Sequence, residues 1–322
     1  VHLDKRRRHC QVVQAWPCHC SAWPWLAAVA AGRTAARAMG GRQGQQAGQD
    51  LGEDSPLPDW VDLRHFEEID STQSFSEREH EKFDQGRLTV VSADFQTAGR
   101  GTRDRKWEGS RGLSVLMTFF FRFPPDRPTA FVNQNVPNVT KVLALAMVEA
   151  LQWAAGDHRD ALKFGVKWPN DVVVNRRKIG GILARAVPSP GARLDGVIIG
   201  IGANVNTPAE DLATIDRPVW PATSLRAETG QVYDVAAVRR RVIANFAGEL
   251  PLFFEQGFAA FRARVNDLEV LMGARVRFRV SDSEVVDGVF DGVDDLGNIL
   301  LRLPDGEERS YPSGEIIPSP DA

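Results

Sequence analysis

Asp171 and Lys178, near the middle of the chain, have the residue types and the spacing of an anion-binding site. Asp171 ends the segment 167–171, which reads KWPND, and Lys178 begins a segment that reads KIGGIL. Apolar residues on both sides of a turn at 175–177 predict two short strands. Pro169 cannot donate to a sheet ladder, so both charged residues are expected at the rim of a sheet. A carboxylate and an ammonium beside a glycine pair suit an anion and its metal ion, although a charged hairpin turn would show the same pattern.

A second segment, residues 96–107, has the composition of a phosphate-binding loop. It reads QTAGRGTRDRKW and follows a predicted strand at 88–93. Glycines expose backbone N–H groups, and basic side chains complement phosphate oxygens. A solvated loop rich in glycine and arginine is the plain alternative.

Length and composition predict about two globular domains. The chain has 322 residues, of which 43% are hydrophobic and 25% charged, and its net charge is -3. The charge argues against a polyanion-binding surface over the whole chain, so any basic site must be local. No run of about 18 apolar residues occurs, so no membrane-spanning segment is expected.

Residues 1–58 differ from the rest and are predicted to be a disordered leader with a Pro-rich linker. Asp4 is the only acidic residue before Asp50, and the leader is rich in alanine and arginine. This composition is typical of a chloroplast or mitochondrial transit peptide; the alternative is non-native sequence upstream of a cytoplasmic enzyme. All three cysteines lie within residues 10–20, so the body of the protein cannot depend on disulfides. No helix-turn-helix pattern appears, which argues against DNA binding.

Hydrophobic periodicity predicts alternating strands and helices after the linker. Asp234 is expected to cap a long helix that Pro251 ends or kinks. The expected strands are 61–69, 88–93, 112–121, 162–174, 179–184 and 197–201, and the expected helices are 75–83, 139–150, one from 235, and 253–265. From residue 271 the pattern changes to short strands at 276–280, 284–290, 298–303 and 308–311, with turns at 291–292, 296–297 and 304–306.

Residues 200–204, which read GIGAN, superficially match a dinucleotide-binding fingerprint. The third glycine is missing, and residues 206–208 read NTP instead of opening a helix. We therefore reject a Rossmann interpretation.

Taken together, these segments resemble biotin protein ligases. The matching pieces follow the order of the family and are residues 71–73 (STQ), the 99–101 loop ending in 106–107 (KW), 167–171, 178–183 and 200–206. The resemblance covers about residues 66–318. It implies an α+β fold: a mixed central sheet packed with helices, a class II synthetase-like catalytic domain, over residues 59–270, and an SH3-like β-barrel over residues 271–322.

The resemblance implies an AMP-forming carbon–nitrogen ligase. Such an enzyme forms biotinyl-5′-AMP from biotin and ATP with Mg²⁺. It then transfers biotin to a lysine of a biotin carboxyl carrier domain of acetyl-CoA carboxylase or a related carboxylase. The expected partners are therefore biotin, ATP and the carrier protein, with no nucleic acid and no membrane; pairing of two copies through a sheet edge stays open.

The resemblance also implies residue roles. The catalytic candidates are Arg100, Lys178 and Asp171, the last also holding the metal. The biotin-binding candidates are Ser71, Thr72, Gln73, Gln96, Arg100, Gly101, Thr102, Lys178 and Gly181. The ATP-binding candidates are Arg100, Arg103, Trp107, Lys167, Asn170 and Asn204, with Arg105 and Lys106 drawing in the triphosphate.

Thr102 departs from the family pattern, which has an arginine directly after the second glycine of this loop. The departure implies weaker retention of the adenylate unless Arg103 substitutes. Two alternatives remain. A lipoate–protein ligase has the same type of fold but needs a longer apolar slot, and a nucleic-acid-binding module would use the basic residues 100–106.

Overall fold

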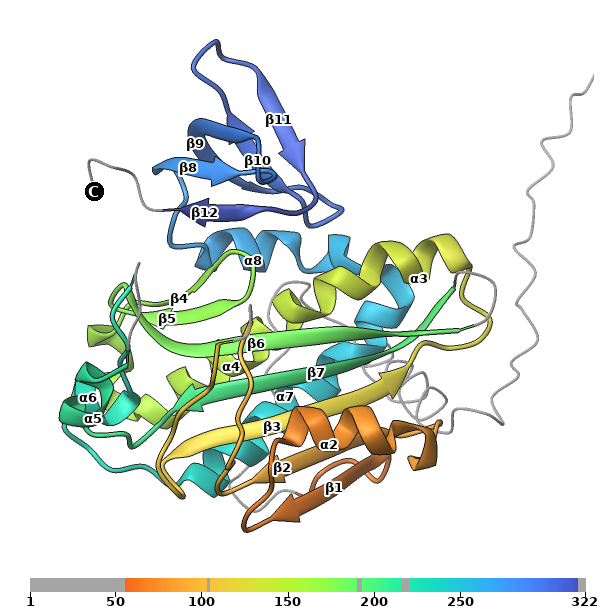
Figure 1. Cartoon of the computed structure of the whole chain (residues 1–322), viewed down its shortest axis with the longest axis vertical. Helices are drawn as coiled ribbons and strands as arrows, with labels where there is room; N and C mark the ends of the chain where they lie inside the picture. Colours follow the sequence, from red (N-terminus) through yellow and green to blue (C-terminus); the bar gives the residue numbers. More distant parts are fainter. Residues whose placement is uncertain (1–55, 103–104, 190–192, 216–219, 318–322) are drawn as a thin grey trace, which may run out of the picture.

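The structure is a computed structural model that describes residues 56–102, 105–189, 193–215 and 220–317. Within these ranges the chain forms a seven-stranded sheet of order β1-β2-β3-β7-β6-β5-β4 and a five-stranded sheet of order β11-β10-β9-β8-β12 (Figure 1). The transit peptide, the cysteines, the helix-turn-helix question and Arg103 all concern residues outside the described part.

Strand β1 pairs with β2 in parallel, and every other pairing in the large sheet is antiparallel. The strands of this sheet are β1 (Val61–Phe66), β2 (Leu88–Ala93), β3 (Ser114–Arg122), β4 (Phe164–Lys167), β5 (Asp171–Val174), β6 (Arg177–Pro188) and β7 (Leu194–Asn204). Those of the small sheet are β8 (Arg275–Arg279), β9 (Val285–Val293), β10 (Ile299–Arg302), β11 (Glu308–Tyr311) and β12 (Glu315–Ile317).

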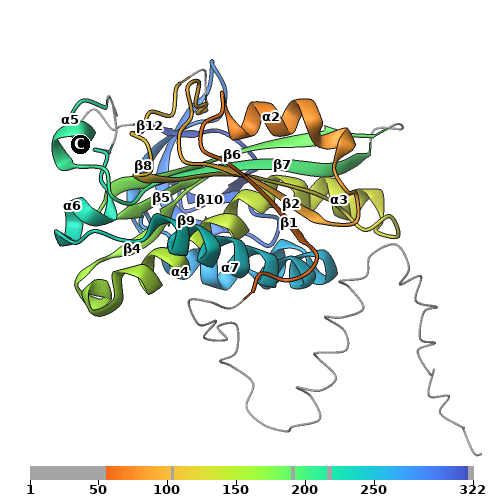
Figure 2. The same cartoon turned by 90° about the horizontal axis from the view of Figure 1, so that it is seen from below.

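Helices cover both faces of the large sheet. Figure 2 shows α2 on one face and α4 and α7 on the other. The α-helices are α2 (Thr72–Glu79), α3 (Thr129–Asn135), α4 (Val139–Ala155), α5 (Ala209–Ala213), α6 (Leu225–Thr229), α7 (Val235–Gln256) and α8 (Arg262–Leu268). The 3₁₀ turns are η1 (His80–Lys82), η2 (Val136–Asn138), η3 (Gly156–Ala161) and η4 (Phe258–Ala260). The α+β prediction is confirmed, including the mixed sheet and the small C-terminal all-β unit.

Burial explains why the central elements were predictable. The first eight residues of β3 are all buried, as expected of a strand covered on both faces. Helix α4 ends where Gly156 adopts a positive φ of 52°. The helical stretch Thr129–Ala161 has the length and the mean hydropathy (1.2) of a membrane span, but 67% of its most apolar window is buried inside the protein. This burial is that of a core helix.

Several predicted boundaries were wrong. The first helix starts at Thr72 and not at residue 75, because the Ser71 hydroxyl accepts a hydrogen bond from the Ser74 N–H and caps it. Helix α7 continues through Pro251 to Gln256, since the buried rings of Phe253 and Phe254 hold its last turn in the core.

In the small sheet, one expected turn is part of a strand. Ile299 pairs with Val293 and Leu301 pairs with Phe290, so β9 has one extra residue opposite β10. The predicted turn at 291–292 is therefore a β-bulge inside β9, where Gly292 has a φ of 97°. Strand β12, with three residues, is too short to have shown a pattern.

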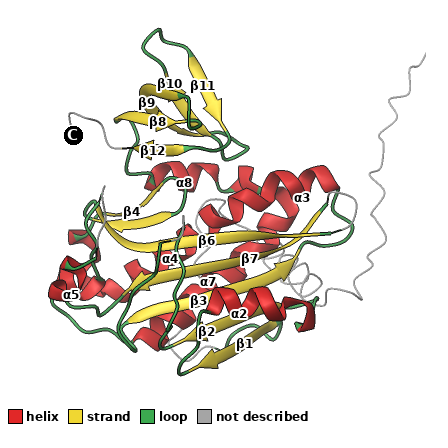
Figure 3. Cartoon of the chain, viewed as in Figure 1, coloured by secondary structure: helices red, strands yellow, loops and turns green. Residues whose placement is uncertain are grey.

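The connection between the two domains lies along strand β4. The Val270 N–H donates to the Val166 carbonyl at 3.0 Å, and Glu269 forms a parallel bridge with Val166. The small sheet therefore sits beside the end of the large sheet that β4 forms, next to α8 (Figure 3). There Trp168 packs edge-on against Phe278 of the small sheet, with ring centres 5.7 Å apart.

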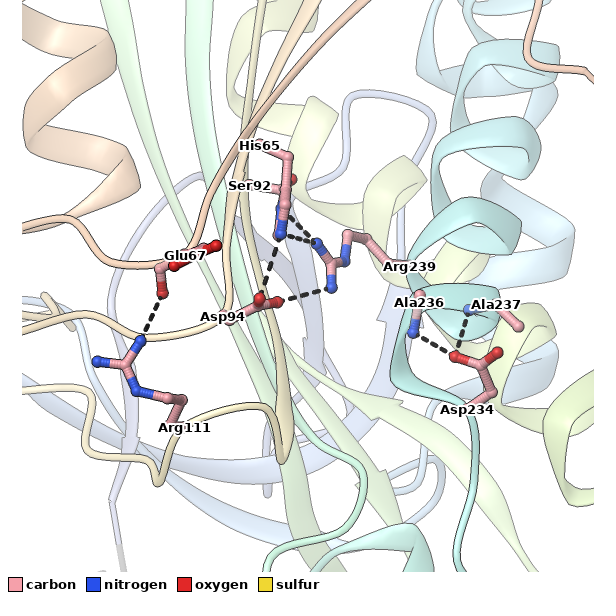
Figure 4. A network of polar contacts seen from close by, with 9 residues as sticks. All are labelled: His65, Glu67, Ser92, Asp94, Arg111, Asp234, Ala236, Ala237 and Arg239. Atoms are coloured by element: carbon pink, nitrogen blue, oxygen red, sulfur yellow. Dashed lines mark hydrogen bonds and ion pairs between the residues drawn. The ribbon is translucent and has the colours of Figure 1, made fainter.

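The opposite edge of the large sheet is attached to α7 by a polar cluster (Figure 4). Arg239 of α7 donates to Asp94 Oδ1 at 3.1 Å and to His65 Nδ1 at 2.5 Å. His65 is on β1 and Asp94 follows β2, so one guanidinium joins a helix to two strands.

We predict that Gly165→Ala destabilises the protein by about 1–3 kcal/mol, because added bulk at a closely packed backbone forces a shift. A Cβ at Gly165 would lie 2.6 Å from the Leu268 carbonyl oxygen of the domain connection. Urea unfolding measures the change. Gly248→Ala in α7 is the matched control: its Cβ would meet nothing within 4 Å, so we expect no loss and a gain of up to about 1 kcal/mol. Equal behaviour of the two variants would contradict the prediction.

Candidate functional site

An open cleft of about 640 Å³ lies between α2, the 99–107 loop and the central strands of the large sheet. The predicted site residues that line it are Ser71, Thr72, Gln73, Gln96, Arg100, Gly101, Thr102, Arg105, Lys106, Trp107, Asn170, Asp171, Lys178 and Gly181. The structure thus brings together residues from four separate sequence segments.

The described parts of the 99–107 loop, residues 99–102 and 105–107, lie antiparallel to each other along the cleft. The Gly101 N–H donates to the Arg105 carbonyl at 2.7 Å, and the Trp107 N–H donates to the Gly99 carbonyl at 3.0 Å. Arg100 and Lys106 face each other in an antiparallel bridge. At the turn, the Arg105 guanidinium donates to the Thr102 hydroxyl at 3.1 Å and to its carbonyl at 3.2 Å.

Trp107 lies directly on the glycines of the neighbouring strands. A Cβ at Gly202 would come 2.5 Å from Trp107 Cε2, and one at Gly181 would come 3.5 Å from Cζ3. These glycines therefore make room for an aromatic ring from the loop. In a dinucleotide-binding fingerprint the glycines would instead let the backbone approach a pyrophosphate. Among the described residues, the buried Trp107 Nε1 has no hydrogen-bond partner.

The inner end of the cleft is neutral and polar. Gln96 Oε1 accepts from the Thr72 N–H at 2.8 Å and from the Thr72 hydroxyl at 3.0 Å. Thr118 of β3 donates its own hydroxyl to Thr72 at 2.9 Å. We did not predict Thr118, because a threonine in an apolar strand gives no signal of its own. Gln73 Oε1 is buried and lacks a partner within the described ranges, so the cleft offers an unused acceptor here.

The outer end of the cleft carries charge. Lys178 Nζ lies 2.5 Å from Asp171 Oδ1, and both side chains are about one-fifth exposed. Arg100 Nη1 lies 2.8 Å from Glu77 Oε2. Arg100, Lys178 and the Asp171 carboxylate thus line one cavity, as expected if the three act on the same substrate.

Asn170 is oriented by the backbone of the adjacent strand. Its amide nitrogen donates to the Ile182 carbonyl at 2.7 Å, and the Ile182 N–H donates to the Asn170 carbonyl at 3.0 Å. These two bonds hold the end of the KWPND segment against β6. They therefore fix the position of Asp171, the first residue of β5.

Two predicted ATP-binding residues do not line the cleft. Asn204 is the last residue of β7, and its side-chain amide donates to the Thr223 carbonyl at 3.1 Å. This hydrogen bond ties the end of β7 to the segment before α6. Lys167 lines a second, small cavity behind the KWPND segment, together with Lys141 and Glu269. Their contact with ATP stays a prediction.

Behind the KWPND segment, Glu269 holds the backbone of that segment. Its carboxylate accepts from the Trp168 N–H at 3.0 Å and from the Leu271 N–H at 3.3 Å. Burial raises the pKa of Glu269 to about 8. Burial lowers the pKa of the nearby Lys141 ammonium to about 8. The domain connection thus supports the segment that carries Asp171 from the side opposite the cleft.

Comparison with known proteins gives matches over both domains. Residues 65–204 match the family described as "Biotin/lipoate A/B protein ligase family", and residues 271–317 match the "Biotin protein ligase C terminal domain".

The similar proteins include two bacterial sequences and one solved structure. The chain is 33% identical over 223 residues to the "Bifunctional ligase/repressor BirA" of Bacillus subtilis, a match that covers 69% of this chain and 64% of that protein. It is 31% identical over 227 residues to the "Biotin--[acetyl-CoA-carboxylase] ligase" of Paracoccus denitrificans, covering 70% of this chain and 89% of the relative. The structure titled "Biotin protein ligase from Aquifex aeolicus in complex with biotin and ATP" superposes with a TM-score of 0.62 at 28% identity, covering 80% of this chain and 97% of that one. The chain thus spans about 64% of the length of the BirA relatives.

We predict that Glu269→Gln flattens the pH dependence of stability. Between its ordinary pKa of 4.5 and the folded value of about 8, Glu269 keeps a proton that the unfolded chain has released. The free energy of unfolding of the wild type should therefore fall as pH rises from about 5 to about 8, and glutamine has no proton to lose. Urea unfolding at both ends of this range gives the slope.

Glu307→Gln is the matched control for the pH experiment. Arg309 holds the pKa of the exposed Glu307 carboxyl below its ordinary value, so this group stays ionised across the range. The slope should be unchanged in this variant. If Glu269→Gln keeps the slope of the wild type, burial of Glu269 does not have the effect described.

Proposed function

Because the chain belongs to the biotin protein ligase family, we propose that it is an ATP-dependent ligase that forms biotinyl-5′-AMP and transfers biotin to a lysine of a biotin carboxyl carrier domain. The observation that carries the proposal is the division of one cleft into a neutral polar end and a charged end. A substrate with an uncharged hydrogen-bonding ring and a distant carboxylate matches this division.

The neutral end suits the ureido ring of biotin. A buried ring of this kind needs a donor for its carbonyl and acceptors for its two N–H groups. Gln73 Oε1 is an acceptor without a partner in the described part of the chain, and the threonine–glutamine network beside it supplies further polar groups. The aliphatic chain of biotin would then lead toward the charged end.

The charged end suits adenylation. A carboxylate oxygen of biotin attacks the α-phosphorus of ATP, the bond to the bridging oxygen breaks, and pyrophosphate leaves. Arg100 and Lys178, which both line the cleft, would neutralise the charge that spreads over the phosphate oxygens in the transition state. Trp107, which now lies over the glycines of β6 and β7, would stack on adenine after the loop rearranges.

Asp171 is the candidate ligand for Mg²⁺. Within the described ranges, no three His, Cys, Asp or Glu side chains are grouped so that they would hold a metal. A single carboxylate fits Mg²⁺, which commonly binds one or two carboxylates, water and the phosphates of its nucleotide. When bound, the ion would neutralise the departing pyrophosphate.

In the second step, the neutral amine of a carrier lysine attacks the acyl carbon of the adenylate. The amide bond forms and AMP leaves with the electrons of the broken C–O bond. The name of the Paracoccus relative supports acetyl-CoA carboxylase as the source of the carrier domain.

The alternatives fit the cleft less well. Lipoate would place an apolar ring against the polar end of the cleft and would leave the buried Gln73 Oε1 without a partner. Binding of a polynucleotide through the basic loop would need cations that are free to reach phosphates, yet Arg100 is paired with Glu77 and the Arg105 guanidinium donates to Thr102 within the loop.

The test of the proposal is an incubation of the protein with ATP, Mg²⁺ and a purified carrier domain, with biotin or lipoate as the acid. Mass spectrometry of the carrier should show the mass of one biotinyl group. A lipoyl adduct instead, or no adduct with either acid, would overturn the proposal.

We predict that Lys178→Ala reduces biotin-dependent ATP–pyrophosphate exchange by about 10²–10³-fold or more, because one cation that stabilises the transition state is lost. The control is Lys82→Ala, which removes an exposed ion pair to Glu79 outside the cleft. Thermal unfolding checks that both variants fold. Exchange at the rate of the wild type in Lys178→Ala would refute the assignment.

We predict that the protein releases biotinyl-AMP faster than its Thr102→Arg variant. Residue 102 is a threonine, whose hydroxyl accepts a hydrogen bond from Arg105. The loop therefore has no guanidinium at this position that could order it over the adenylate. The dissociation rate, measured by chasing preformed adenylate with excess biotin and ATP, should fall severalfold in the variant. A slow release that the substitution does not change would count against this role.

A further inference from the structure

Glu77 does not line the cleft, but it contacts one residue at each end of it, Gln73 at the neutral end and Arg100 at the charged end. It lies on α2 four residues after Gln73, so the two side chains share one face of the helix. The Glu77 side chain is 18% exposed. Neither the sequence pattern nor the proposed reaction gives it a role.

One oxygen of Glu77 determines how the Gln73 amide is turned. Gln73 Nε2 donates to Glu77 Oε1 at 3.4 Å. An ionised carboxylate only accepts hydrogen bonds, so the amide nitrogen must face Glu77 and the amide oxygen must face away. The two ends of a glutamine amide have nearly the same shape, and only their partners decide between the two orientations. Glu77 is thus the reason that Gln73 offers an acceptor next to Gly200.

The other oxygen of Glu77 holds a cation at the cleft wall. Arg100 Nη1 lies 2.8 Å from Glu77 Oε2, and Arg185 Nη1 of β6 lies 3.2 Å from the same atom. Arg100 is 44% exposed, and a long side chain with that much exposure samples many rotamers unless a partner restrains it. The pair keeps the guanidinium beside the cleft.

We propose that Glu77 is a positioning residue that sets up both ends of the cleft at once. Through Oε1 it makes Gln73 present a carbonyl oxygen to an N–H of the bound ring, and through Oε2 it keeps Arg100 beside the place where the carboxylate and phosphate react. This inference rests on the proposed function, since it assumes that an N–H donor of the substrate meets Gln73.

The test compares Glu77→Ala with Glu77→Gln, and with Glu79→Ala as the matched control. Alanine keeps the helix, because it is the best helix former. Glu79 is on the same helix, but it pairs with Lys82 at the surface and away from the cleft. Calorimetry gives the Kd for biotin, and pyrophosphate exchange gives KM and kcat.

Glu77→Ala should raise the Kd for biotin at least tenfold, because the freed amide can turn its nitrogen toward the ligand N–H and leave two donors facing each other. Glu77→Gln should recover most of the affinity, since its carbonyl oxygen still accepts from Gln73 Nε2. It should not recover kcat fully, because a neutral amide holds Arg100 less firmly than a carboxylate. Glu79→Ala should match the wild type.

A double-mutant cycle shows whether Glu77 acts through Gln73. Gln73→Ala alone should weaken biotin binding, and adding Glu77→Ala to it should change the Kd by less than twofold. Effects that simply multiply would mean that Glu77 acts by another route and would overturn the inference.

The outcomes separate this inference from the proposed function. If the folded wild type neither binds biotin nor forms an adenylate, the proposed function itself is refuted. An active wild type with a Glu77→Ala variant that binds biotin within twofold as tightly would overturn the role of Glu77 alone. Equal losses in Glu77→Ala and Glu79→Ala would likewise overturn it, because they would reflect a general change in α2.

Discussion

The antiparallel pairing of β6 with β5 on one side and with β7 on the other is the constraint on which the site depends. The register places Gly181 beside Asp171 and opposite Gly202, so three consecutive strands bring these residues together on one stretch of sheet. Glycines at these points leave space above the strands, and the Trp107 ring now lies there. A side chain at Gly202 would collide with this ring.

Two of the cations that line this cleft are held in ion pairs. Lys178 is held by Asp171, and Arg100 is held by Glu77. Each pair restrains a long side chain that would otherwise sample many rotamers, so both cations are held in position. In the proposed reaction, a carboxylate and a triphosphate would bring several negative charges, which could replace the present partners of these cations.

The small C-terminal sheet supports the same site from behind. The domain connection pairs with β4, the Glu269 carboxylate binds the Trp168 N–H, and the Trp168 ring packs on Phe278. Asp171 follows Trp168 by three residues. The position of the metal-binding candidate is therefore tied to the packing of a separate domain, which explains why such a small unit is attached so closely to the large sheet.

The sequence by itself determined the classes of element and the identity of the chemical groups. Periodicity was enough for β3 and α4, because burial on both faces or on one stripe leaves a regular pattern. The KWPND, KIGGIL and glycine–arginine segments were recognisable because their chemistry needs particular residue types. Only the tertiary structure decided which groups meet. Thr118, Glu77 and Glu269 carry no local signal, since each acts on a residue that is distant in the sequence or one helical turn away. The same reason explains why α7 ends at Gln256 and not at Pro251 and why residues 291–292 are not a turn, since packing and cross-strand register outweighed the local preference.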